Sequence, residues 1–215
     1  IVNCLPLNEG ERRAFAKAAR DVPQEFVGDE AHRGDMVWSA AVPEELRSRA
    51  TAVIGNFPVS QASQYTRLEW LQTFSAGVDA YICPGVLPRG TMVTNASGAY
   101  GQSVSEHMFA TMWALMKNLN RYASNQRDHQ WQDEGPVLSP EGGIALIIGV
   151  GDIGSHFAQL AQSVGMRTFG VRRHADVPAK GIEKMYGFER LETLLPLADV
   201  VAMAVPRSPQ THHLL

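Results

Sequence analysis

The sequence predicts an α/β fold in two domains. Short apolar runs alternate with segments of helical spacing along its 215 residues, which is typical of parallel sheets covered by helices on both faces. A small, glycine-containing break at 95–101 interrupts this alternation, so we expect one domain over residues 1–97 and a second over 98–215. Apolar residues make up 45% of the chain and charged residues 19%, a composition that lets a globular protein bury a core.

The first domain is expected to begin with a strand in the apolar run 1–5. A charged segment of helical spacing follows that run. Pro43 stands where a short helix would start, because proline is favoured in the first turn. Further strands are expected at four short apolar runs, 36–38, 52–54, 68–74 and 92–94.

The second domain is expected to begin with a long helix over 102–118. Its apolar positions recur at helical spacing and include several methionines, which indicates a core face or a subunit interface. A linker that contains Pro and Gly follows at 135–143. The alternation then resumes, with strands at 144–148, 167–171, 184–186 and 200–205 and helices at 152–164 and 191–197.

The stretch GVGDIG, residues 149–154, is the strongest functional signal. A GxGxxG pattern alone is weak, but this one follows an apolar strand, opens a helix and leads to a second strand, as a dinucleotide site requires. Gly149 allows the tight turn, Gly151 lets the backbone approach a pyrophosphate, and Gly154 lets the helix pack close to the strand. The helix N-terminus offers free N–H groups to the phosphates. The alternative interpretation is a tight turn without a ligand.

The residue about 20 positions past such a turn, at the end of the second strand, selects the cofactor. An Asp or Glu there binds the ribose hydroxyls of NAD, whereas this chain has Arg172 followed by Arg173, and its nearest acid is Asp176. A guanidinium can pair with a phosphate in a bidentate way. We therefore predict NADP(H), with Arg172 on the 2′-phosphate and Arg173 assisting. The alternative is NAD(H), with the arginines at a solvated strand end.

A second candidate is TFSAGVDAY, residues 73–81, which places Ser75, Ala76 and Gly77 after a predicted strand. Backbone amides exposed there could bind a carboxylate, since no side chain would be in the way. An ordinary strand-to-helix turn is the alternative, and spacing alone favours it.

Charge and composition disfavour several classes of function. The net charge of -3 disfavours nucleic acid or an anionic membrane as the main partner. No stretch approaches the ~20 apolar residues of a membrane span. The run 1–7 leads directly into charged residues, unlike a signal peptide. Two cysteines, Cys4 and Cys83, are too few for a cysteine metal site and indicate reduced thiols in a cytoplasmic protein, so no metal is expected.

Six stretches carry a resemblance to a known family: SAGVD (75–79), TNASG (94–98), VSEH (104–107), Trp131, GVGDIG (149–154) and ADVVAMAVPRSPQTHHLL (198–215). In order and spacing they resemble the NAD(P)-dependent D-2-hydroxyacid dehydrogenases over almost the whole chain. That family includes glyoxylate/hydroxypyruvate reductases, phosphoglycerate dehydrogenases and D-lactate dehydrogenases. One departure is Ser105, where the family usually has Ala.

The resemblance implies a flavodoxin-like substrate-binding domain and a Rossmann NAD(P)-binding domain, with the active site in the cleft between them. It implies hydride transfer between the nicotinamide and the 2-carbon of a small 2-keto or 2-hydroxy acid, of the glyoxylate or hydroxypyruvate class. It also implies a homodimer paired through the long helix. The alternatives are a formate- or phosphite-type dehydrogenase on the same scaffold, or a dinucleotide-sensing, corepressor-like binding protein.

The resemblance also implies individual site residues. The family's catalytic Arg, Glu and His are expected beyond Leu215, so none of the residues present is predicted to be catalytic. The Rossmann domain is accordingly expected to be truncated at its C-terminal end and this segment to be inactive alone. Independently of the resemblance, Phe57 is expected to line the substrate side-chain pocket, from its place in GNFP after an early strand. The implied substrate-binding amides are those of Ala76, Gly77 and Val78, and the implied cofactor residues are Gly149, Gly151, Asp152, Ile153 and Gly154 at the pyrophosphate and Val205, Pro206 and Thr211 near the adenosine.

Overall fold

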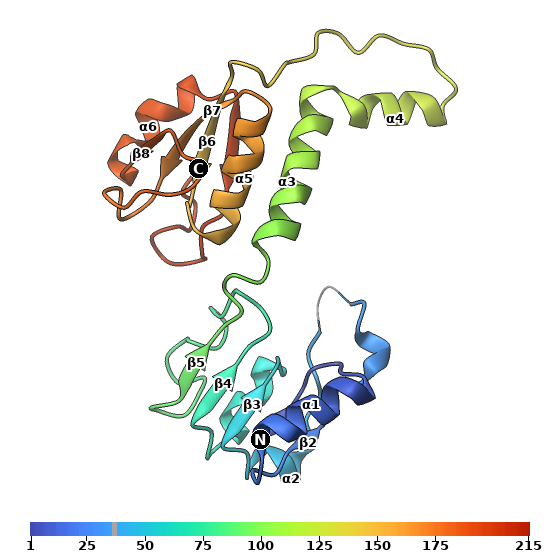
Figure 1. Cartoon of the computed structure of the whole chain (residues 1–215), viewed down its shortest axis with the longest axis vertical. Helices are drawn as coiled ribbons and strands as arrows, with labels where there is room; N and C mark the ends of the chain where they lie inside the picture. Colours follow the sequence, from blue (N-terminus) through green and yellow to red (C-terminus); the bar gives the residue numbers. More distant parts are fainter. Residues whose placement is uncertain (36–37) are drawn as a thin grey trace. The chain divides into compact units, whose positions relative to one another are not determined.

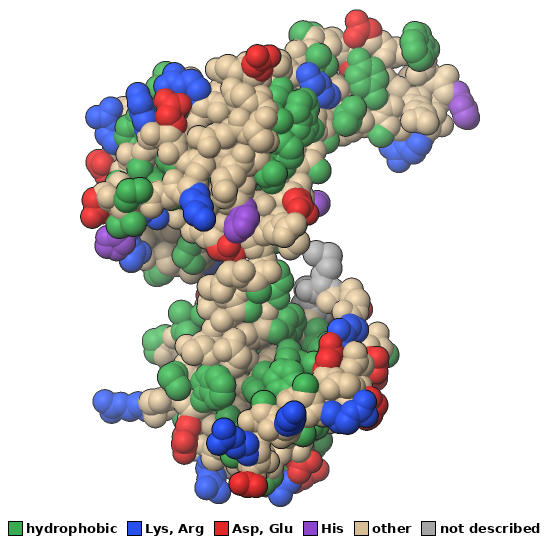
Figure 2. Space-filling model, in the orientation of Figure 1, with side chains coloured by type: hydrophobic (Ala, Val, Ile, Leu, Met, Phe, Trp, Pro, Cys, Tyr) green, Lys and Arg blue, Asp and Glu red, His purple; other side chains and the backbone are tan. Residues whose placement is uncertain are grey.

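The computed structural model describes residues 1–35 and 38–215, and the chain forms two compact units, Ile1–Ser97 and Gly98–Leu215 (Figure 1). Each unit has its own parallel sheet and its own hydrophobic core, so the predicted α/β class is confirmed. On the face drawn in Figure 2, basic and acidic side chains are intermixed over the first unit. None of the helices in the described ranges is long and apolar enough to cross a membrane.

The first unit is built on five parallel strands, β1 (Val2–Asn3), β2 (Glu25–Phe26), β3 (Ala52–Ile54), β4 (Trp70–Gln72) and β5 (Met92–Thr94). Their spatial order is β2-β1-β3-β4-β5. This is the flavodoxin-like order of a doubly wound sheet, which the resemblance implied. In such a sheet, ligands bind at the carboxyl ends of the strands, so the turns after β3, β4 and β5 are the candidate positions.

Helices and short 3-10 turns connect these strands: α1 (Glu9–Ala19), η1 (Glu30–His32), α2 (Glu44–Arg47) and η2 (Val59–Gln64). The start of α1 is set by a capping box between Asn8 and Glu11. The Asn8 side chain accepts from the Glu11 amide at 2.9 Å, and the Glu11 carboxylate accepts from the Asn8 amide at 3.0 Å. Two donors that a helix start leaves unpaired are therefore satisfied by side chains.

Phe57 belongs to the core of the first unit. Its side chain is 1% exposed, stacks on Tyr65 with ring centroids 4.3 Å apart, and meets the Tyr81 ring edge-on at 5.2 Å. The Tyr81 hydroxyl donates to the Phe57 carbonyl at 2.5 Å. The expectation that Phe57 lines a substrate pocket is therefore wrong, because aromatic neighbours enclose the ring.

Two strand expectations in this unit need comment. The expected strand 36–38 rests mostly on residues outside the described ranges, and its last residue, Trp38, is in no strand. The Trp38 indole N–H donates to the carbonyl of Cys4 at 2.8 Å. Conversely, β2 was not expected, because a two-residue strand that begins with the charged Glu25 is too short to show the alternation of apolar and polar residues that predicts a strand.

The second unit is built on four parallel strands, β6 (Ile144–Ile148), β7 (Arg167–Val171), β8 (Lys184–Tyr186) and β9 (Val200–Met203). Their spatial order is β8-β7-β6-β9, which is the 3-2-1-4 order of a Rossmann sheet. The central strand, β6, has four consecutive residues that are 0% exposed, as its unbroken apolar run predicts. The strand expected at 200–205 ends earlier, at Met203.

The helices of this unit are α3 (Gly101–Met116), α4 (Leu119–Arg127), α5 (Asp152–Ser163) and α6 (Leu191–Leu194), with 3-10 turns η3 (Phe188–Arg190) and η4 (Leu195–Leu197) beside α6. α3 lies along α5, and Met112 and Met116 from its methionine stripe are buried in the core beneath. Leu115, on another side of the same helix, is 65% exposed.

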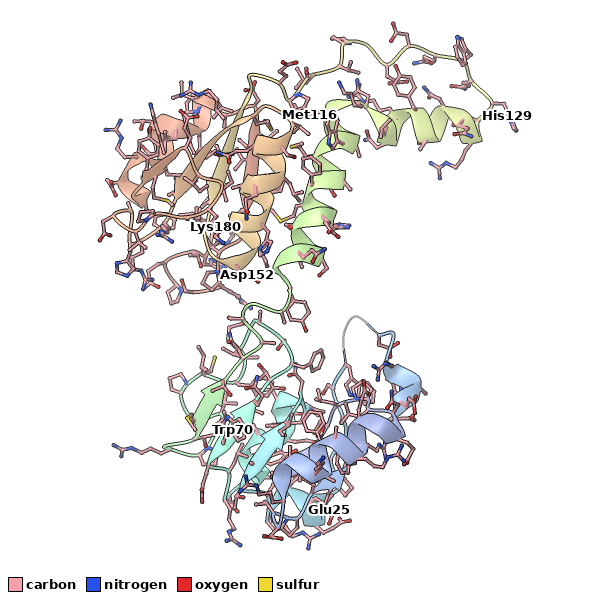
Figure 3. All side chains as sticks on the ribbon, in the orientation of Figure 1. Glu25, Trp70, Met116, His129, Asp152 and Lys180 are labelled. Atoms are coloured by element: carbon pink, nitrogen blue, oxygen red, sulfur yellow. The ribbon has the colours of Figure 1, made fainter. Side chains whose placement is uncertain are left out.

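α4 was not expected as a separate helix. Asn118 has a φ of 54°, a left-handed conformation that ends α3 and turns the chain into α4. In Figures 1 and 3, α4 and the chain after it, which passes His129, extend away from the sheet of their own unit. No helix or strand forms between α4 and β6.

Candidate cofactor site

The turn after β6 has three glycines in three different steric environments. Gly149 has a φ of +90°, and a Cβ there would lie 2.4 Å from the carbonyl oxygen of Ala204. A Cβ on Gly154 would lie 2.2 Å from the carbonyl oxygen of Gly149. A Cβ on Gly151 would have no atom within 4 Å. Gly149 and Gly154 are therefore required by the fold, whereas Gly151 leaves the backbone accessible to a ligand.

The N-terminus of α5 follows directly from this turn. Its N-cap is Gly151, which provides no side-chain hydrogen bond. The amide of Ser155 begins the helical pattern by donating to the Gly151 carbonyl at 3.0 Å. Within the described residues, the amides of Asp152, Ile153 and Gly154 have no acceptor. Such a helix end combines unpaired donors with the positive end of the helix dipole and is suited to an anion.

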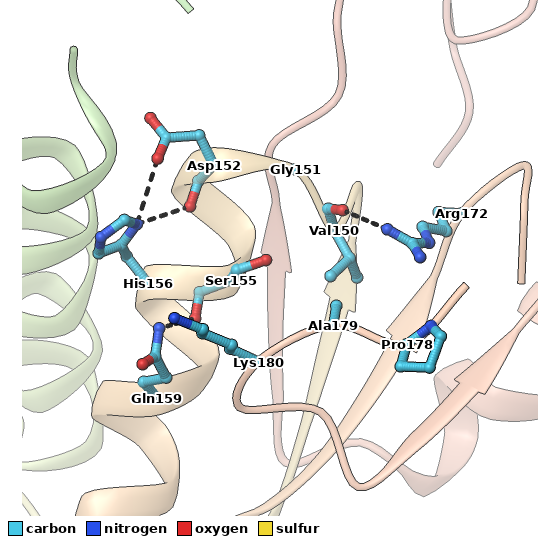
Figure 4. A pocket seen from close by; sticks show the side chains of 10 residues that line it. All are labelled: Val150, Gly151, Asp152, Ser155, His156, Gln159, Arg172, Pro178, Ala179 and Lys180. Carbon is cyan, nitrogen blue, oxygen red and sulfur yellow. Dashed lines mark hydrogen bonds and ion pairs between the residues drawn. The ribbon is translucent and has the colours of Figure 1, made fainter. Parts of the chain in front are cut away.

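A cavity of about 470 Å³ adjoins this helix end, and we call it the α5 cavity (Figure 4). Its walls come from the turn after β6, the first turns of α5, the end of β7 and the loop that follows β7. The lining residues are Val150, Gly151, Asp152, Ser155, His156, Gln159, Arg172, Pro178, Ala179 and Lys180.

The two arginines at the end of β7 have different surroundings. Arg172 is partly buried and lines the α5 cavity, and its guanidinium donates to three carbonyl oxygens. Nε reaches the carbonyl of His174 at 2.9 Å, Nη1 that of Val150 at 3.3 Å, and Nη2 that of Val177. Arg173 is exposed and is not among the residues that line the cavity. Arg172 therefore joins the loop after β7 to the glycine turn.

Asp152 faces His156, one turn further along α5. The His156 Nδ1 lies 3.3 Å from an Asp152 carboxylate oxygen and 2.9 Å from the Asp152 carbonyl oxygen. The start of α3 is close as well, because a Cβ on Gly101 would lie 2.2 Å from the same carboxylate oxygen. The Asp152 carboxylate is thus turned towards His156 and α3. Ile153, which was also predicted for the cofactor, is not among the residues that line the cavity. The described residues contain no group of three or more side chains that could hold a metal ion.

The loop after β9 lies against the glycine turn. A Cβ on Gly149 would be 2.8 Å from a methyl carbon of Val205, so this side chain covers the turn. The Thr211 hydroxyl donates to the Pro206 carbonyl at 2.6 Å and accepts from the Ser208 amide at 2.9 Å. Thr211 therefore holds the 206–211 loop closed.

In the first unit, the turn after β4 is held by its carbonyl groups. Asn95 donates to the carbonyl of Ala76 at 2.7 Å, and the Ser75 hydroxyl donates to that of Gly77 at 2.8 Å. The Val78 carbonyl accepts from the Tyr81 amide at 2.9 Å. The amides of residues 76–78 have no acceptor among the described residues, and Gly77 is exposed. Three consecutive free amides in a fixed turn can bind a carboxylate.

The residues predicted for the cofactor thus fall into separate groups. Gly151, Asp152 and Arg172 meet at the α5 cavity, while Gly149 and Gly154 shape the turn. Sequence reasoning missed four polar lining residues: Ser155, His156, Gln159 and Lys180. The first three could have been found from their helical spacing after the glycines, but the position of Lys180 depends on how its loop folds back.

Comparison with known proteins identifies the family. Residues 109–215 match the family model for the NAD binding domain of D-isomer specific 2-hydroxyacid dehydrogenases. A solved structure of a family protein from Aeromonas salmonicida subsp. salmonicida A449 superposes with a TM-score of 0.76 at 26% identity, over 99% of this chain and 66% of that one. Residues 109–215 therefore belong to the NAD binding domain of the D-isomer specific 2-hydroxyacid dehydrogenase family.

Two curated relatives bear names of enzymes of this kind. The chain is similar to a glycerate dehydrogenase of Methylorubrum extorquens, with 25% identity over 183 residues, which cover 81% of this chain and 55% of the relative. It is also similar to a glyoxylate reductase of Thermococcus gammatolerans, with 27% identity over 157 residues, which cover 69% and 47%. The chain therefore spans about half the length of the curated relatives it matches.

The turn after β6 fits the dinucleotide of an NAD binding domain, which is the description of the matching family model. A pyrophosphate needs a close approach to the backbone, and Gly151 is the one glycine of the three whose Cβ position is open. The amides at the start of α5, which no side chain caps, follow Gly151 directly in the chain. The residues present therefore fit the phosphates of a dinucleotide.

Proposed function

We propose that the chain is part of an oxidoreductase that transfers a hydride between NADP(H) and the 2-carbon of a small 2-keto or 2-hydroxy acid. The observation that carries the proposal is the turn after β6. Glycine is sterically required there at 149 and 154, and Gly151 leaves the backbone open to a ligand. The bound nicotinamide would supply the hydride, and the protein would bind and orient both reactants. Relatives named glycerate dehydrogenase and glyoxylate reductase support the glyoxylate or hydroxypyruvate class of substrate.

The choice of NADP(H) over NAD(H) rests on the end of β7. Arg172 stands where an acidic residue would select NAD, and it lines the same cavity as Gly151. Arg173 is the assisting cation in this proposal, from the exposed side of the same strand end. A charge-assisted hydrogen bond contributes about 1.5–3 kcal/mol, so Arg172→Ala should weaken NADPH binding about tenfold or more.

Fluorescence titration of the chain with NADPH and NADH tests the cofactor assignment. We expect saturable binding of both nucleotides, with the tighter Kd for NADPH in the wild type and a loss confined mainly to NADPH in Arg172→Ala. A wild type that binds NADH more tightly would contradict the NADP(H) preference. A wild type that binds neither nucleotide would contradict the dinucleotide site itself.

For the substrate, we propose that the free amides of Ala76, Gly77 and Val78 bind the carboxylate. Their carbonyls are all engaged in hydrogen bonds, so the turn can present its amides without reorganising. Gly77→Val should weaken binding of glyoxylate or hydroxypyruvate and leave the Kd for NADPH nearly unchanged, because the two sites use different turns. An equal loss for nucleotide and keto acid would contradict this assignment.

We also propose a homodimer in the cytoplasm. Large apolar side chains are exposed on α3, on α4 and on the chain after them: Leu115, Leu119, Tyr122, Trp131, Val137 and Leu138. Several large apolar side chains exposed on successive elements are typical of an interface, and a second copy would cover them. Both cysteines are free thiols, as a reducing compartment requires. Sedimentation velocity tests the dimer, and a monomer at micromolar concentration would contradict it.

A further inference from the structure

The loop between β7 and β8 folds back onto α5 and carries Lys180 with it. Gly181 has a φ of +73°, and a Cβ there would lie 2.6 Å from the backbone nitrogen of Gln159. The loop backbone therefore touches the helix backbone at this point. Lys180 lines the α5 cavity as a result, and Figure 4 shows it on the α5 side, beside Gln159.

The hydrogen-bonding capacity of Arg172 is already partly used. A guanidinium has five N–H donors, and three of those on Arg172 point to the carbonyl oxygens of Val150, His174 and Val177. These bonds hold the side chain in one orientation and join the loop to the glycine turn. Two N–H groups remain for a ligand.

Lys180 is the cation of the cavity with all its donors available. In the part of the chain that the structure describes, its ammonium group has no hydrogen-bond or ion-pair partner. Asp152 is the sole carboxylate among the lining residues, and it faces His156 at 3.3 Å. An ammonium on a flexible stem can follow a phosphate, whereas the anchored guanidinium of Arg172 cannot.

We propose that Lys180 is a specificity-determining residue for the 2′-phosphate of NADP(H), and that Arg172 mainly positions the loop that carries it. The proposal rests on the proposed dinucleotide site and assigns within it a residue that the position after β7 does not indicate. Lys180 supplies the mobile positive charge and Arg172 the fixed one. The 2′-phosphate would then lie between the end of β7 and the second turn of α5.

Two nucleotide probes isolate this interaction. Adenosine 2′,5′-bisphosphate and 5′-AMP differ only in the 2′-phosphate, and isothermal titration calorimetry gives the Kd of each for the whole chain. Lys180→Met removes the charge and keeps the side-chain length. Lys180→Arg keeps the charge. Lys184→Met is the matched control, because it removes a lysine of the same unit that does not line the cavity.

We expect Lys180→Met to weaken the bisphosphate about tenfold and 5′-AMP less than about twofold, because one charge-assisted contact is lost from the first ligand alone. Lys180→Arg should retain most of the affinity, and Lys184→Met should match the wild type. Thermal melts that agree with the wild type show that each variant is folded.

The inference is overturned if Lys180→Met binds the bisphosphate as tightly as the wild type does. It is also overturned if both nucleotides weaken equally, since that pattern indicates a general change in the cavity. A wild type that binds neither probe would overturn the proposed dinucleotide site, and this inference with it. The first two outcomes leave that site intact, so the two failures are distinguishable.

Discussion

The N-termini of α1 and α5 are built in opposite ways, although both helices follow the first strand of a parallel sheet. α1 begins with a capping box, in which the side chains of Asn8 and Glu11 satisfy backbone amides. α5 begins with Gly151, which offers no side chain, and the amides of residues 152–154 have no acceptor among the described residues. One helix end is satisfied by its own sequence, and the other is left open.

This difference separates a helix start that its own side chains satisfy from one whose amides are available to a ligand. A free helix end costs stability unless water or a ligand satisfies its amides. The uncapped amides of α5 carry this cost in stability. Gly149 and Gly154 have no room for a Cβ, so the close packing of the turn depends on glycine at both positions. At α1, by contrast, Glu11 also accepts a bidentate pair of hydrogen bonds from Arg33. These side-chain contacts therefore stabilise the helix end in the first unit, whereas the open helix end in the second unit is where we propose that a dinucleotide binds.

The largest expected effect comes from closing the turn sterically. Gly149→Ala places a Cβ 2.4 Å from a backbone oxygen at a φ of +90°, and we expect a loss of about 3 kcal/mol in the free energy of unfolding of the second unit. Urea unfolding followed by circular dichroism measures it. A variant as stable as the wild type would show that the turn relaxes easily. Glycine would then not be required by the fold at position 149.

A smaller effect is expected from giving α5 the kind of cap that α1 has. Gly151→Ser places a hydroxyl where it can accept from the free amides. Its effect on stability should be within about 0.5 kcal/mol, because Ser and Gly differ little at an N-cap. NADPH binding should fall about tenfold or more, because the hydroxyl takes the amides that the phosphate needs.

Gly151→Ala is the matched control for that substitution. It adds the Cβ, which meets no atom within 4 Å, and it supplies no cap. If Gly151→Ser lost affinity for NADPH and Gly151→Ala did not, the free amides of α5 would be the feature that binds the phosphate. Equal losses in both variants would show that open space is what matters. Unchanged NADPH binding in both would contradict the site.

The reverse substitution removes the cap from α1. Asn8→Ala should lower the stability of the first unit by about 1 kcal/mol, the usual cost of losing an Asn cap. NADPH affinity should not change, because Asn8 and the α5 cavity belong to different units. Thermal unfolding and the NADPH titration, made on the same sample, check both parts. A fall in NADPH affinity would contradict the prediction that the start of α1 has no part in nucleotide binding.

The sequence predicts much of the second unit because its signals are local. The strands β6, β7 and β8 have the expected bounds, since apolar and β-branched residues make up most of each and turn residues flank them. The glycine turn was predictable for the same reason, because positive φ and close backbone contacts leave glycine as the allowed residue. α4 was missed because it depends on a single left-handed residue, Asn118.

The site was less predictable where it depends on tertiary contacts. Lys180 reaches the α5 cavity because Gly181 rests on the backbone of α5, and no spacing in the sequence expresses that contact. Arg172 was expected on a phosphate, yet three backbone carbonyls also accept its hydrogen bonds. The turn at 76–78 is held in part by Asn95, 17 or more residues away along the chain. Contacts between distant segments decide each of these cases.

The smallest expected effect is a pH dependence confined to the α1 end. The hydrogen bonds from Arg33, and then from the Asn8 amide, lower the pKa of Glu11 to about 2. An unfolded Glu titrates near about 4.3, so the folded value is the lower one. The stabilisation is therefore present above pH ~4.3 and is lost as the pH falls towards 2. Arg33→Met should raise the Glu11 pKa towards its ordinary range, as carboxyl carbon shifts in an NMR titration would show, while the Asn8 amide still lowers it. Arg13→Met, which removes the partner of Glu9 instead, should leave the Glu11 pKa low. A Glu11 that titrates near its ordinary value in the wild type would mean that the capping box at α1 is weaker than its geometry indicates, and the contrast with α5 would narrow accordingly.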